Sequence, residues 1–178
     1  MPSPTQPILL RFKKIPGGAT ALSCTRADGS VTWQRSAAAH AAFFARHDLT
    51  HYAVETVLGY GLGFYGLLAA GWEFTDFGAP WPRGPIPANA DPAELIVGFF
   101  DAERAGDRPW TTEQFNEFAR SFYAGARSDP PVVTADQLSA IRQRVSELFQ
   151  QWDAIYPGET LELQFPQDAS AGIQPPTE

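Results

Sequence analysis

The chain has 178 residues, 44% of them hydrophobic, which suits one compact domain with its own apolar core. Its formal net charge of −7 argues against nucleic acid as a partner, because binding to a phosphate backbone needs clustered lysines and arginines. A single cysteine, Cys24, excludes an internal disulfide and a cysteine-rich zinc site, and fits a reducing compartment.

The N-terminal part of the chain predicts three β-strands. The first residues lack a basic segment followed by an apolar run, so we expect no secretory signal and a cytoplasmic location. Residues 8–14, 19–26 and 31–35 have strand composition and are separated by short glycine-containing turns. Such turns permit only antiparallel pairing, so we expect a three-stranded meander. Cys24 lies in the alternating pattern of the second strand and is expected to pack rather than react.

A helix is predicted next. Ser36 is a favourable N-cap for residues 37–45, which are rich in alanine. Asp48 has the features of a second N-cap, so we predict that one helix ends and another begins near His47. His40 would share a face with His47 only if the helix continued unbroken.

The most informative pattern is His-Asp-x-x-His-x-x-x-Glu, formed by His47, Asp48, His51 and Glu55. Four residues along a helix turn little more than a full circle, so the two histidines and the glutamate would lie on one stripe. Neighbouring members of the stripe can share a metal ion, but its ends would be about 12 Å apart along a straight helix. Either the helix breaks, or one residue orients a ligand without binding the ion itself.

This pattern predicts a metal-binding protein with His47, His51 and Glu55 as ligands, or with Glu55 as an orienting carboxylate. Zinc is the favoured divalent ion, and iron, nickel and manganese also suit these ligands. The spacing is similar to the His-Glu-x-x-His of zinc hydrolases, which suggests a metal-dependent hydrolase of an unknown small molecule, with Asp48 and Glu55 as catalytic residues.

Two other hypotheses remain open at the level of sequence. In the first, the protein is a non-catalytic binding or interaction protein, and the same polar residues form a structural hydrogen-bond network. In the second, a histidine and a glutamate perform acid–base catalysis without a metal. Whether the protein is an enzyme is therefore undecided from the sequence.

The segment 47–55, with 63–67 and the Asp28-Gly29 turn, resembles a group of short bacterial proteins of unassigned function that share an HDLxHYxVE motif. The resemblance covers most of the chain. It implies a family with a fixed polar motif, but it carries no activity, substrate or cofactor.

The middle of the chain predicts buried helices and then a long loop. Residues 56–72 are uncharged but too short and glycine-rich for a membrane span, so we expect a buried helix–turn–helix and no membrane partner. The acidic residues within 73–77 are expected in a solvated loop, with a third metal ligand as the alternative. The proline-rich residues 79–90 predict an ordered surface loop in which Trp81 and Arg83 either pack or close over a ligand.

Three further helices are predicted over residues 91–105, 111–122 and 134–155, each preceded by an N-terminal capping signal. Asp91 is expected to cap the first of them. Asp101, on the same helix, is expected to face solvent as one of several charged residues.

Residues 160–165 alternate apolar and polar side chains and predict a last strand beside the N-terminal ones. We therefore expect an α+β fold, in which an antiparallel sheet made of the N-terminal three-strand meander and the C-terminal strand is covered by five or six helices. Residues 1–166 would form a single domain and residues 167–178 a mobile tail. Charged residues make up only 19% of the chain, which favours apolar surface and a homo-oligomer.

Overall fold

A four-stranded antiparallel sheet joins the two ends of the chain. The computed structural model describes residues 7–126 and 128–167. Its strand order is β3-β2-β1-β4, and the strands are β1 (Ile8–Lys14), β2 (Thr20–Thr25), β3 (Val31–Ser36) and β4 (Thr160–Phe165). Both the predicted meander and the predicted pairing of the C-terminal strand are confirmed. Beyond Gln167, the predicted tail lies outside the described residues.

One face of the sheet is covered, and alternation along the strands determines which one. In β1, Leu10 is fully buried and lies opposite Cys24 of β2 and Leu163 of β4, so apolar side chains form a row across the sheet. Cys24 is fully buried as well, and burial raises the pKa of its thiol to about 11. This confirms the prediction that Cys24 packs in the core.

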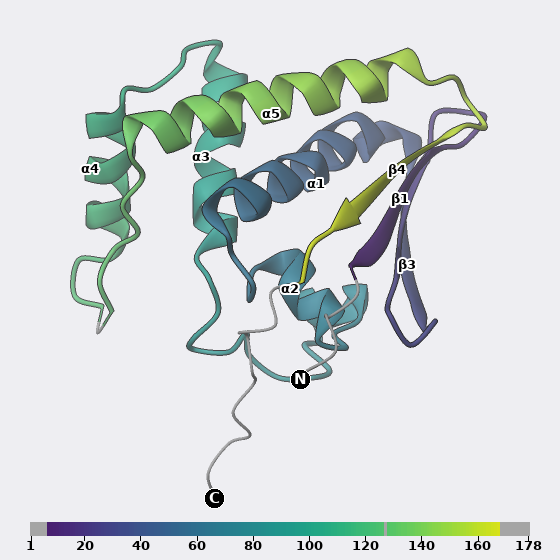
Figure 1. Ribbon diagram of the computed structural model, residues 1–178, viewed down its shortest axis with the longest axis horizontal. Coiled ribbons are helices and arrows are strands. Elements are labelled where there is room, and N and C mark those ends of the chain that lie inside the picture. Colours follow the sequence, from purple (N-terminus) through teal and green to yellow (C-terminus); the bar gives the residue numbers. More distant parts are fainter. Residues whose placement is uncertain (1–6, 127, 168–178) are drawn as a thin grey trace, which may run out of the picture.

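The remaining elements of the described chain are helices, and with the antiparallel sheet they confirm the α+β class. They are α1 (Ala38–Leu58), α2 (Phe64–Ala69), the short 3-10 helix η1 (Phe74–Phe77), α3 (Ala93–Gly106), α4 (Thr112–Phe122) and α5 (Ala135–Ala154). Figure 1 shows α1 at the centre, between the sheet and the helices α3 and α5, with α4 at the outer edge. Within the described ranges, none of the helices has the length and apolar character needed to span a membrane.

The central helix α1 runs through the polar motif without interruption, so the predicted break near His47 is wrong. Every residue from 48 to 55 is buried, because the sheet and the helices α2, α3 and α5 surround this part of α1. Asp48 does not cap a helix; its backbone carbonyl instead accepts a hydrogen bond of 2.8 Å from the hydroxyl of Tyr65. Packing on all sides thus outweighs the local capping signal.

The start of α3 is also displaced from its prediction. Pro92 is the N-cap residue, and the Asp91 carboxylate accepts a 2.6 Å hydrogen bond from the backbone N–H of Leu62. Asp91 therefore ties the connector after α1 to the beginning of α3, which brings the first turn of α3 against α1. The capping boxes predicted for α4 and α5 are both formed, by Thr111 with Gln114 and by Thr134 with Gln137.

Candidate metal site

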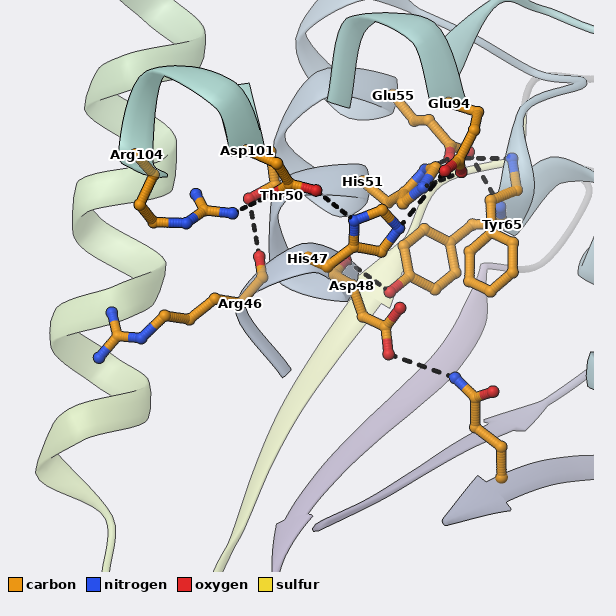
Figure 2. Close-up of polar contacts among 12 residues, drawn as sticks. Arg46, His47, Asp48, Thr50, His51, Glu55, Tyr65, Glu94, Asp101 and Arg104 are labelled. Atoms are coloured by element: carbon orange, nitrogen blue, oxygen red, sulfur yellow. Dashed lines mark hydrogen bonds and ion pairs between the residues drawn. The ribbon is translucent and has the colours of Figure 1, made fainter. Parts of the chain in front are cut away.

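Three potential ligands converge where α1 meets the first turn of α3. His47 and His51 project from α1, and Glu94 projects from α3 toward them (Figure 2). One ligand atom from each residue lies within 4.8 Å of the others. The two imidazole rings are 4.9 Å apart between centroids. This separation is short enough for both rings to contact one ion.

His51 is buried and lies between two carboxylates. Its Nδ1 is 3.1 Å from Oε1 of Glu55, and its Nε2 is 2.9 Å from Oε2 of Glu94. A neutral imidazole has only one N–H, so two carboxylate contacts favour the doubly protonated ring. Burial acts to lower the pKa of His51, but the hydrogen bonds to the two carboxylates outweigh it and raise the pKa to about 9.

Glu55 is fixed behind His51 by the backbone of α2. Its oxygens accept hydrogen bonds from the N–H groups of Phe64, at 2.9 Å, and Tyr65, at 3.0 Å. Burial raises the pKa of Glu55, although its hydrogen bond with His51 opposes that shift. A Cβ atom at Gly63 would lie 2.6 Å from the Glu55 carboxyl carbon, so the carboxylate fits only because that position is glycine. Glu55, predicted as a metal ligand or an orienting carboxylate, therefore contacts His51 from outside the three-residue cluster.

Glu94 is the third member of the cluster and is not among the ligands predicted from the sequence. One carboxylate oxygen contacts His51, and the other lies 3.8 Å from Nε2 of His47. Its side chain is 77% exposed, so it can move without disturbing the core. The hydrogen bond from His51 lowers the pKa of Glu94, which keeps the carboxylate ionised.

His47 has its own orienting carboxylate. Its Nδ1 is 2.7 Å from Oδ2 of Asp101. The other carboxylate oxygen of Asp101 pairs with Arg104, which also lies on α3. The Asp101 side chain is only 16% exposed, so its predicted solvent position is wrong. Asp101 follows Glu94 by two helical turns, and both residues face α1 for that reason. Each histidine thus contacts a carboxylate through Nδ1 while its Nε2 faces Glu94, a known arrangement for histidines that bind metals.

Asp48 lies beside the cluster but is not part of it. Its buried carboxylate accepts a 3.3 Å hydrogen bond from the side-chain amide of Gln34 on β3. Burial raises the pKa of Asp48 to about 6, although the nearby His51 and His47 act in the opposite direction. This carboxyl group can therefore exchange a proton near neutral pH.

A cavity of about 490 Å³ opens beside the cluster and includes Asp48 in its lining. Trp81, from the proline-rich loop, is part of the wall. Arg83 of the same loop instead lies 3.4 Å from Asp76 and over the ring of Trp72.

The remaining acidic and histidine candidates lie elsewhere. The third histidine, His40, is exposed at the start of α1 and contacts Phe44. Glu73 and Asp76 form a capping box around η1 and do not belong to the ligand cluster. Comparisons of this chain with protein-family models, curated protein sequences and solved structures give no match.

Proposed function

We propose that the protein binds one divalent metal ion through Nε2 of His47, Nε2 of His51 and the carboxylate of Glu94, and that it is a metal-dependent hydrolase of a small molecule. The observation that carries the proposal is the pair of Nδ1 contacts, from His51 to Glu55 and from His47 to Asp101. With Nδ1 engaged in this way, Nε2 of His51 contacts the Glu94 carboxylate at 2.9 Å and Nε2 of His47 lies 3.8 Å from it. Two histidines and one carboxylate suit zinc first, and also iron, nickel or manganese.

The proposal assigns different roles to the surrounding acids. Glu55 and Asp101 accept the remaining N–H of each ligating ring and hold it in position. Asp48 is the candidate general base, because it lines the same cavity and its pKa of about 6 allows it to accept a proton from water near neutral pH. Three protein ligands leave a position for water or substrate, as hydrolytic metal sites require.

Zinc titration of the purified protein by calorimetry, with elemental analysis, tests the metal site. We expect one zinc ion per chain, and a loss of affinity of at least about 100-fold in His47→Ala, His51→Ala and Glu94→Gln, because each removes a ligand. His40→Ala is the matched control, since this exposed histidine lies on the same helix outside the cluster. If the unaltered protein binds none of zinc, iron, nickel and manganese, the proposed site is ruled out.

Hydrolysis needs a separate test. We expect the zinc-loaded protein to cleave a small neutral ester such as p-nitrophenyl acetate, to lose this activity in EDTA and to regain it with zinc. Asp48→Asn should retain zinc but lower turnover about 100-fold or more, because it removes the candidate base. Zinc binding without zinc-dependent turnover on this ester or on related amides would contradict the hydrolase assignment and retain the metal site.

A non-catalytic network is the second candidate, and one observation favours it. Both ring nitrogens of His51 already have carboxylate partners within the protein. If the network is purely structural, the protein binds no zinc at stoichiometric concentrations, and His51→Ala lowers only its stability. The zinc titration therefore separates the two functions.

A further inference from the structure

We infer that the cavity beside His47, His51 and Glu94 accepts an uncharged or cationic molecule that carries an aromatic or aliphatic group, and that it rejects phosphate, sulfonate and carboxylate compounds. The inference names the substrate class of the proposed site, and it rests on the proposed function only for the claim that the bound molecule is a substrate. The binding preference itself follows from the walls of the cavity.

The walls are mainly apolar and aromatic. They include Phe44 from α1, Phe64 and Leu67 from α2, Phe77 from η1, and Trp81 and Ile86 from the loop before α3. The ring of Phe64 is 5.0 Å from that of His51 and 4.7 Å from that of Phe77, so the aromatic wall reaches the ligand cluster without a gap. An apolar group on a ligand would therefore lie directly beside the proposed metal.

The charged groups that line the cavity are acidic. Asp48, Asp91 and Glu94 contribute carboxylates, and among the described residues no lysine or arginine takes part in the lining. Behind the histidines, Glu55 adds a further carboxylate, whereas the charge of Asp101 is shared with Arg104.

The positive charges near the cavity do not outweigh its carboxylates. In the metal-free protein, the cationic ring of His51 is already paired with two carboxylates. When a divalent ion replaces the proton on that ring, the carboxylates in and behind the cavity still outnumber its charge. In the metal-free protein, an anionic ligand would thus enter a region of negative potential, and among the described residues the lining has no basic side chain to pair with it.

Trp81 is a large aromatic residue of the cavity lining that stays exposed. Its side chain is 49% exposed although it is large and apolar, and its backbone has φ of 58°, a left-handed conformation that is rare for a residue other than glycine. Turn hydrogen bonds hold it there, from its N–H to Gly78 and from the N–H of Gly84 to its carbonyl. Such a backbone, maintained in the lining of a cavity, marks Trp81 as a residue that contacts the ligand.

Two fluorescent probes with the same ring system test the inference. N-phenyl-1-naphthylamine is neutral, and 8-anilinonaphthalene-1-sulfonate adds one negative charge. We expect the metal-free protein in EDTA to bind the neutral probe at least ten times more tightly than the sulfonate. Trp81→Ala should weaken binding of the neutral probe at least fivefold. The control Trp33→Ala should not, because Trp33 is 66% exposed on β3 and does not line the cavity.

Charge is tested separately with Glu94→Gln, which removes one carboxylate from the lining. The ratio between the two dissociation constants should fall at least threefold, mainly through tighter binding of the sulfonate. Equal affinity for the two probes, no binding of the neutral probe, or equal effects of the two tryptophan substitutions would each overturn the inference.

The probes bind without a metal, so their result is independent of the zinc titration. If zinc does not bind but the neutral probe shows the expected preference, the cavity specificity stands and the proposed metal site fails. If zinc binds but the two probes are not discriminated, the metal site stands and the inferred substrate class is wrong.

Discussion

Glu55 and Asp101 each contact Nδ1 of one histidine, but in different surroundings. Glu55 is buried, and its oxygens accept two backbone N–H groups as well as the contact with His51. Asp101 lies nearer the surface and shares its charge between His47 and Arg104. The same substitution at the two positions should therefore affect metal affinity alike but stability differently.

We expect both Glu55→Gln and Asp101→Asn to weaken zinc binding by about 10- to 100-fold, because each removes the carboxylate that holds a ligating ring. Glu55→Gln should also lower the free energy of unfolding by about 1–3 kcal/mol, since its amide NH₂ cannot accept one of the buried backbone N–H groups. Asp101→Asn should lower the free energy of unfolding by less than Glu55→Gln does. Zinc calorimetry and urea denaturation in EDTA measure the two effects.

Glu162→Gln is the control for loss of a carboxylate as such. Glu162 pairs with Arg11 across the sheet, but both side chains are about half exposed. Its substitution should change stability by less than about 1 kcal/mol and leave zinc affinity unaltered. An unchanged zinc affinity in Glu55→Gln would mean that the carboxylate does not orient His51 for metal binding.

At the scale of elements, the connection between α1 and α2 determines where Glu55 lies. The chain turns after α1 and returns, so the first N–H groups of α2 face the carboxylate. Gly63, the N-cap of α2, leaves the space that this carboxylate fills. Gly63 thus allows the backbone at the start of α2 to approach the Glu55 side chain closely.

Gly63→Ala should therefore lower stability by about 1–3 kcal/mol, because the new methyl group overlaps the buried Glu55 carboxylate. Gly98→Ala is the matched control: Gly98 is exposed within α3, and its added Cβ meets no atom within 4 Å. That change should raise stability by about 0.5–1 kcal/mol, as alanine favours a helix over glycine. Denaturation midpoints of both variants test this pair, and equal values would show that Gly63 has no special role.

Elements defined by local patterns were predictable. Strand composition and short turns predicted the three-stranded meander, alternation predicted β4, and capping signals predicted the starts of α4 and α5. The spacing of His47 and His51 within one helix also indicated that their rings lie close together. The uninterrupted course of α1 was not predictable, because burial on all sides, rather than the residue at position 48, decides it.

The rest of the site depends on how α3 packs against α1. Glu94 is 43 residues beyond His51, and Asp101 is 54 residues beyond His47. Within their own helix, these acids have the positions of an ordinary first-turn acid and an ordinary surface charge. Their two-turn spacing shows that they share a face of α3, but a single sequence does not indicate which helix that face contacts.

For the whole molecule, the charge network makes stability depend on pH. The folded-state pKa of His51, about 9, lies above its usual value of 6.5, and that of Asp48, about 6, lies above 3.8. A raised pKa contributes stability below the usual value and loses it as the pH rises through the folded-state value. The contribution of Asp48 is therefore lost between about pH 4 and 6, and that of His51 between about pH 6.5 and 9.

We accordingly expect the metal-free protein to lose up to about 3 kcal/mol of unfolding free energy between pH 6.5 and 9, from the shift at His51. Urea denaturation in EDTA at several pH values measures this slope. His51→Gln should flatten it, whereas His40→Gln should retain it, because His40 is exposed at the other end of α1. If the slope persists in His51→Gln, its cause is general electrostatic repulsion in this acidic chain rather than His51.

The stabilising effect of zinc should increase with pH, which is opposite to the trend in the metal-free protein. Binding through Nε2 requires His51 to release a proton that Glu94 stabilises at low pH, so zinc affinity rises as the pH approaches 9. The increase in melting temperature produced by a fixed zinc concentration should therefore be larger at pH 8 than at pH 6, and calorimetry at pH 7 should detect proton release in buffers of different ionisation enthalpy. A zinc effect that is equal at both pH values, without proton release, would show that the ion binds away from His51.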